Sequence, residues 1–244
     1  MNWVWFHKLA SPPSAYVFAT RLRPWLFWVS ITMMLWAAYQ GLFVVPVDYQ
    51  QKEAFRIIYV HVPVASLSLT VYSMMAIAAA IGLIWRMKLA HAVAAACALP
   101  GAILTALALA TGSIWGRPMW GAWWAWDARL TSELILLFLY LGYMALRASF
   151  DDIGRADRAS AVLAIVGLVN VPIVRYSVVW WNSLHQGQTL SLLGKSAIDP
   201  SMVAPLVVMI FAFLMFFGSV LCDGLRAEIL RRERNASWLA DLKA

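Results

Sequence analysis

Six apolar stretches, each about long enough to cross a bilayer, constrain this chain more than any other feature. A helix needs about 20 apolar residues to span a hydrocarbon core of about 30 Å. The stretches run Trp25–Val45, Val62–Ile84, Ala92–Gly112, Leu130–Leu146, Ala161–Trp181 and Met202–Cys222. The 244-residue chain is 63% hydrophobic and only 13% charged, whereas soluble domains are about half apolar and a quarter charged. The sequence therefore predicts an all-α integral membrane protein, with one six-helix bundle as a single domain over residues 1–244.

The positive charges are distributed unequally between the two sides of these stretches. The larger set flanks both termini and the second and fourth connections: Lys8, Arg21, Arg23, Arg86, Lys88, Arg147, Arg155, Arg158, Arg226, Arg231, Arg232, Arg234 and Lys243. The smaller set lies on the other side: Lys52, Arg56, Arg117, Arg129, Arg175 and Lys195. Because cytoplasmic loops carry an excess of Lys and Arg, we expect both termini in the cytoplasm, with the chain in a bacterial inner membrane. Membrane topology accounts for the net charge of +7, and nucleic-acid binding is not expected.

A tryptophan-rich segment, residues 115–129, lies between the third and fourth stretches. It contains Trp115, Trp120, Trp123, Trp124 and Trp126, out of fourteen Trp in the chain. From Trp120 to Asp127 the spacing i, i+3, i+4, i+7 predicts a short interfacial helix with one aromatic face. Each Trp buries about 150–250 Å², so a few together exceed the largest exposed apolar patch of a typical monomer, about 300–600 Å². We favour a ligand platform, and an aromatic belt at the membrane interface is the alternative.

Two histidines, His61 and His185, fall on the same side of the membrane as the tryptophan-rich segment. Imidazole is a common metal ligand and the usual proximal ligand of haem iron. A non-haem iron site that combines both histidines with Asp127 stays open as an alternative. Haem needs fewer protein ligands, presents a flat apolar face to indoles, and carries two propionates that suit Arg. The sequence thus favours haem bound through His61, His185 or both, with Arg56 and Arg129 as candidate partners of the propionates.

Arg175, inside the fifth stretch, has two interpretations. Its side chain either reaches out to the membrane interface or faces the bundle, where it meets Glu133 or a bound anion. Glu133 also follows Arg129 by four residues, so that pair is explained equally well by a local helix contact.

Three motifs resemble those of the CcmC family, within the WWD superfamily of haem-handling proteins. They are Trp115-Gly through Trp126-Asp127 and Arg129-Leu-Thr-Ser, Tyr59-Val-His61-Val-Pro63, and Trp180-Trp-Asn-Ser-Leu-His185-Gln-Gly. The resemblance covers nearly the whole chain. It implies that the two periplasmic histidines of the family are His61 and His185, and that the WWD residues run from Trp115 to Asp127.

The same resemblance implies a function and a set of partners. Such a protein binds haem b at the periplasmic face of the inner membrane and presents it to the haem chaperone CcmE. There a covalent bond forms between a haem vinyl group and a histidine of CcmE. CcmA, CcmB and CcmD complete the assembly.

Two other classes of protein stay open beside this haem-binding transfer protein, which is not expected to be an enzyme. A cytochrome b-like redox subunit needs axial histidine pairs at two depths, yet His7 and His91 lie outside the apolar stretches on the other side. A transmembrane haem transporter needs a polar path, and Asn170 is the one notable polar residue near mid-bilayer.

Overall fold

The computed structural model describes residues 11–181, 183, 185 and 198–241, and this part of the chain is helical without a sheet. Six helical segments within it are long and apolar enough to cross a membrane: Pro12–Val44, Glu53–Trp85, Lys88–Trp120, Ala128–Ala148, Ile153–Trp180 and Pro200–Arg232. The prediction of a six-helix, all-α membrane protein is confirmed. Each segment exceeds or closely matches its apolar stretch, because polar residues at the ends continue the helices beyond the hydrocarbon core.

The helices follow one another with short connections, apart from residues 181–199 between the fifth and sixth spans. Their bounds are α2 (Pro12–Tyr39), α3 (Ile58–Trp85), α4 (Lys88–Trp120), α5 (Ala128–Ala148), α6 (Ile153–Gly167), α7 (Asn170–Trp180), α8 (Pro200–Arg232) and α9 (Trp238–Asp241). A π-helical turn, η1 (Gln40–Val44), extends α2, and a 3-10 turn, η2 (Glu53–Ile57), leads into α3. The fifth span is therefore two helices, α6 and α7, with a break at Leu168 and Val169.

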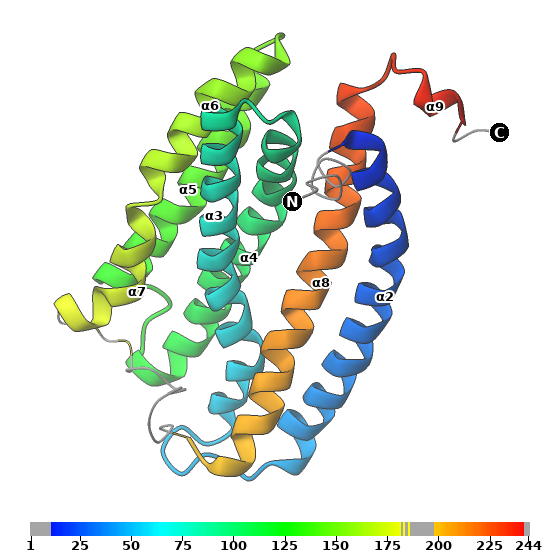
Figure 1. Cartoon of the computed structure of the whole chain (residues 1–244). Coiled ribbons are helices and arrows are strands. Elements are labelled where there is room, and N and C mark those ends of the chain that lie inside the picture. Colours follow the sequence, from blue (N-terminus) through cyan, green and yellow to red (C-terminus); the bar gives the residue numbers. More distant parts are fainter. Residues whose placement is uncertain (1–10, 182, 184, 186–197, 242–244) are drawn as a thin grey trace, which may run out of the picture.

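The bundle has two parts and two chemically different ends. Helices α3 to α7 form one group, and α2 lies along α8 beside it (Figure 1). The start of α2 and the end of α8 lie at the same end, which we call the termini end (Figure 1). The opposite end, where α3 begins and α4 finishes, is called the imidazole end because it holds His61. An even number of spans places both described ends of the chain on one side of the membrane.

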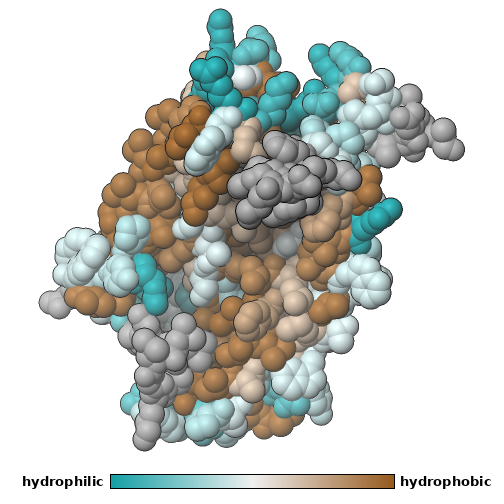
Figure 2. All heavy atoms as spheres, in the orientation of Figure 1, coloured by the Kyte–Doolittle hydropathy of each residue, from teal (hydrophilic) through white to brown (hydrophobic). Residues whose placement is uncertain are grey.

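The surface of the bundle is apolar around its middle. Figure 2 shows hydrophobic residues over the central part of one face and hydrophilic residues concentrated towards the two ends. Large apolar side chains point outward along α2 and η1, including Trp25 in α2, which is 74% exposed, and Phe43 in η1, which is 75% exposed. Such exposure is costly in water and favourable in lipid. The chain is therefore a multi-pass membrane protein.

The predicted short helix from Trp120 to Asp127 is wrong. Helix α4 continues through Gly116 and Pro118 to Trp120 and ends at Gly121, whose φ of 75° is left-handed. Glycine adopts this conformation without steric cost, and a left-handed residue after the last turn terminates a helix. Residues 121–127 form an irregular connection, and the next helix begins at Ala128. The spacing of the tryptophans has the period of a helix, but Gly121 interrupts that helix after its first member.

Candidate functional site

His61 lies in the first turn of α3 and has a defined hydrogen-bond partner. Its Nδ1 is 2.9 Å from the Thr111 hydroxyl oxygen. The Thr111 hydroxyl donates its own proton to the Leu107 carbonyl, at 2.6 Å. Since that proton is used, the hydroxyl oxygen accepts from the ring, and Nδ1 carries the hydrogen. With the hydrogen on Nδ1, a neutral His61 imidazole has its lone pair on Nε2.

Asp127 connects the start of α5 to the segment that follows α7. One carboxylate oxygen caps α5 by accepting the Leu130 N–H at 2.8 Å. The other accepts from the Ser183 hydroxyl at 2.6 Å and from His185 Nδ1 at 3.1 Å. Burial alone would raise the pKa of Asp127, but these three hydrogen bonds outweigh it and hold the pKa below the ordinary value. Asp127 is therefore an ionised carboxylate, which only accepts hydrogen bonds.

His185 is neutral at physiological pH. Burial lowers its pKa below the ordinary value of 6.5, and the positive charge of Arg129 acts in the same direction. The hydrogen bond to Asp127 opposes this shift without reversing it. Because the ring donates Nδ1–H to the carboxylate, its Nε2 also carries a lone pair. Both histidines thus share one arrangement, in which Nδ1 is engaged by the protein and Nε2 is the basic atom.

Two of the predicted tryptophans pack against these imidazoles. The Trp115 ring lies 5.5 Å from the His61 ring, and the Trp120 ring lies 4.9 Å from the His185 ring, both edge to face. His61 lies beside Gly112, and Trp120, which contacts His185, lies beside Gly116 on the same helix, although more than a hundred residues separate the two histidines in the sequence. The structure therefore brings together histidines from α3 and from the segment after α7.

A strip of small residues on α4 makes room for these rings. A Cβ at Gly112 would lie 3.2 Å from His61 Cε1, and a Cβ at Gly116 would lie 2.8 Å from Trp120 Cε3. The two glycines are one helical turn apart, so they share a face of α4. Each supports one aromatic ring that a side chain at the same position would displace.

The other three tryptophans of the segment have different environments. Trp123 is 61% exposed and Trp126 is 78% exposed. Trp124 is half-buried, packs against Trp126 with ring centroids 5.4 Å apart, and has a buried Nε1. The five indoles therefore do not form one continuous helical face, because Gly121 redirects the chain after Trp120.

Arg56 is engaged with the backbone of η1. Its guanidinium donates to the Gly41 carbonyl at 2.6 Å and to the Val45 carbonyl at 3.3 Å, and it pairs with Glu53 at 2.6 Å. These contacts satisfy carbonyls at the end of a helical segment, where intrahelical partners are lacking. A role for Arg56 towards a propionate stays a prediction, and it would have to coexist with this structural one.

Arg129, the other predicted propionate partner, lies in the first turn of α5. The charges that act on it are those of Glu133, Arg175 and Asp127. Glu133 is 7% exposed and accepts a hydrogen bond from the Ser68 hydroxyl at 2.7 Å. Arg129 and Glu133 are thus close, as the four-residue spacing predicts, while the side chain of Arg175 is exposed.

Sequence reasoning missed a buried ion cluster at the termini end. Asp157 accepts two hydrogen bonds from Arg232, at 2.7 and 2.8 Å, and Arg147 bridges Asp157 to Glu228. The acidic partners are largely buried, with side-chain exposures of 6% and 12%. The four-residue spacing of Glu228 and Arg232 was a visible signal for one pair. Nothing in the sequence indicated that charges from α5, α6 and α8 meet.

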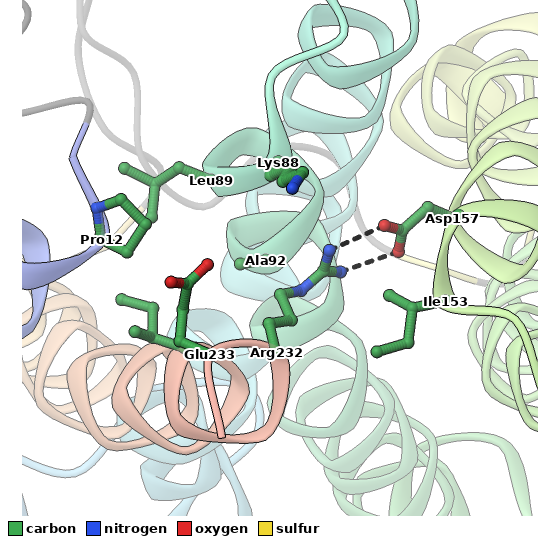
Figure 3. Close-up of a pocket in the computed structure, with 10 residues that line it drawn as sticks. Pro12, Lys88, Leu89, Ala92, Ile153, Asp157, Arg232 and Glu233 are labelled. Atoms are coloured by element: carbon green, nitrogen blue, oxygen red, sulfur yellow. Dashed lines mark hydrogen bonds and ion pairs between the residues drawn. The ribbon is translucent and has the colours of Figure 1, made fainter. Parts of the chain in front are cut away.

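A cavity of about 250 Å³ opens beside this cluster. Figure 3 shows Arg232 reaching across it to Asp157, with Lys88 and Glu233 on its wall. None of the predicted site residues lines it. The cavity and the gathered histidines are therefore separate features at opposite ends of the bundle.

Together these features define a class: a multi-pass helical membrane protein that gathers two neutral imidazoles and two indoles at one end of its bundle. The model of the CcmC family, described as heme exporter protein C, matches residues 5–240. The chain belongs to this family.

Named relatives support the assignment along the full length. Heme exporter protein C of Escherichia coli strain K12 is 47% identical over 240 residues, which cover 98% of this chain and 97% of the relative. The protein of the same name from Haemophilus influenzae is 43% identical, with 98% of both chains covered. A putative cytochrome c biosynthesis ccmC-like mitochondrial protein of Marchantia polymorpha is 46% identical over 182 residues, 75% of this chain and 77% of that one.

Proposed function

We propose that this protein binds haem b at its imidazole end and presents it to the haem chaperone CcmE during cytochrome c maturation. One observation carries the proposal: Nδ1 of His61 contacts the Thr111 hydroxyl and Nδ1 of His185 contacts the Asp127 carboxylate, which leaves Nε2 of each ring to meet iron. A hydrogen-bond acceptor on Nδ1 is the usual way in which proteins orient a metal-binding imidazole and raise its basicity. The relatives' names, heme exporter and cytochrome c biosynthesis, agree with this cargo.

The available ligands suit haem better than a bare metal ion. Among the described residues, no group of three or more His, Cys, Asp or Glu side chains is arranged to hold a metal. The macrocycle supplies four ligands to its iron, so one or two imidazoles suffice. The same end has a buried Trp124 Nε1 without an acceptor among the described residues, which a haem carboxylate would satisfy.

In this function the protein's residues hold the cargo and release it. His185 or His61 ligates the iron from one side, and Trp115 and Trp120 contact the porphyrin. Of the two arginines proposed for the propionates, Arg129 is favoured because Arg56 is engaged with carbonyls. Aromatic contacts contribute only about 0.5–1.5 kcal/mol each beyond the area that they bury. Weak contacts suit a protein that has to release its haem to a partner. In this proposal the protein is a carrier and not an enzyme.

The orientation and the partners belong to the same proposal. The larger set of Lys and Arg flanks the termini end, which favours the cytoplasm for that end and the periplasm for the imidazole end. Haem is then presented outside the inner membrane, where c-type cytochromes are completed. CcmA, CcmB and CcmD are the expected partners in the membrane complex.

Haem titration of the purified full-length protein tests this function. We expect one haem per chain, and at least tenfold weaker binding in His61→Ala and in His185→Ala, measured from the Soret band. His91→Gln, a histidine at the termini end, serves as the matched control and is expected to bind as the wild type does. Wild-type haem affinity in both alanine variants would disprove the site. Two low-spin haems per chain would instead favour a redox subunit.

A further inference from the structure

The indole N–H groups of Trp124 and Trp115 differ in whether they have a hydrogen-bond acceptor. Trp115 Nε1 donates to the Gln51 side-chain oxygen at 2.8 Å. Trp124 Nε1 is buried, yet no acceptor reaches it within the part of the chain that the structure describes. An indole N–H is only a donor, and a buried donor without a partner destabilises the protein. Such a group in a candidate binding region indicates a ligand that accepts a hydrogen bond.

The surroundings of Trp124 indicate an anionic acceptor. Trp124 precedes Asp127 by three residues, a separation of at most about 11 Å along an extended chain. Arg129 follows in the first turn of α5, and its positive charge favours an anion nearby. The two carboxylates that act on Arg129 are already engaged: Asp127 accepts from His185 and two other donors, and Glu133 accepts from Ser68. A carboxylate from outside the chain would satisfy the indole N–H, and the positive charge of Arg129 would favour its binding in this region.

We infer that Trp124 donates its Nε1–H to one carboxylate of the bound haem, and so makes the site selective for the free-acid porphyrin. This inference rests on the proposed function, because it takes haem as the ligand. The indoles then have different roles. Trp115 and Trp120 pack against the imidazoles, and Trp124 binds a propionate carboxylate of haem. Hydrogen bonds to charged groups are the stronger kind, so the contribution is measurable.

Two ligands that differ only at the carboxylates test the inference. Full-length wild-type protein and Trp124→Phe are titrated with iron protoporphyrin IX and with its dimethyl ester, and the Soret band gives each affinity. Phenylalanine keeps an aromatic ring and removes the N–H. We expect Trp124→Phe to bind the free acid about tenfold more weakly and the diester within about twofold of the wild type. Trp25→Phe, on the exposed face of α2, is the matched control and is expected to change neither affinity.

The ratio of the two affinities within one variant is the deciding quantity, because a general loss of folded protein lowers both. Equal weakening for both ligands would overturn the inference and leave Trp124 as a packing residue. An unchanged affinity for the free acid would overturn it as well. If wild-type protein binds neither porphyrin, the proposed function itself fails, whereas binding that depends on His61 and His185 but not on the Trp124 N–H removes this inference alone.

Discussion

The two ends of the bundle use polar side chains in opposite ways. At the termini end Arg147, Asp157, Glu228 and Arg232 pair with one another, so their charges are balanced within the protein. At the imidazole end each histidine has one nitrogen engaged and the other basic, and an indole N–H has no acceptor among the described residues. Groups that satisfy each other hold helices together, whereas groups with a remaining donor or lone pair are available to a ligand. We therefore expect substitutions at the termini end to lower the stability of the fold, and substitutions at the imidazole end to lower the affinity for haem.

The largest expected effect concerns the termini end. Asp157→Ala leaves Arg147 and Arg232 buried with one fewer counter-charge, and breaking a buried ion pair in this way costs about 3–5 kcal/mol. Unfolding of the purified protein in detergent measures the loss. Asp151→Ala, in the exposed turn before α6, is the control and is expected to unfold as the wild type does. A change in haem affinity of the folded Asp157→Ala protein would contradict the division between the two ends.

The second prediction concerns the imidazole end. Asp127→Asn keeps a good helix cap for α5 but removes the negative charge that orients and polarises His185. Loss of a carboxylate that is hydrogen-bonded to a metal-binding histidine weakens metal binding about 10–100-fold. We expect this loss in a haem titration, together with an unfolding transition close to that of the wild type. A large loss of stability with unchanged haem affinity would show that Asp127 belongs functionally with the termini end.

The smallest effect is in the pH dependence. A histidine with a pKa of 6.5 is half protonated at pH 6.5, which would halve its contribution to affinity, but burial holds the pKa of His185 lower. Between pH 7.5 and pH 6.5, a histidine with a pKa of 6.5 would lose about 1.8-fold of its contribution to affinity. The ratio of wild-type to His185→Ala affinity should therefore fall by less than about 1.8-fold over this range. A fall of about 1.8-fold or more would mean that burial does not lower the pKa of His185.

Folding stability should respond in the same pH range. The folded state favours the neutral form of His185. Its contribution to the free energy of unfolding is therefore complete above the pKa that the histidine has in the unfolded chain. The contribution decreases as the pH falls below 6.5 towards the lower folded pKa.

The spans were predictable and the details of the site were only partly so. Apolar stretches of membrane-spanning length determine helices almost regardless of context, so all six were found. The short helix from Trp120 to Asp127 was wrongly predicted because the tryptophan periodicity outweighed Gly121, a single residue that ends α4. The engagement of Arg56 with Gly41 and Val45 depends on where η1 ends, which no local pattern indicates. The pairing of Asp127 with His185 joins residues 58 positions apart and needed the folded chain.

The shared carboxylate of Asp127 also fixes a length. Because Ser183 and His185 are both held by Asp127, the number of residues between Trp180, at the end of α7, and His185 is limited by the position of this carboxylate. One added residue would lengthen the chain by up to about 3.5 Å, comparable with the length of a hydrogen bond, which is enough to separate the imidazole from Asp127.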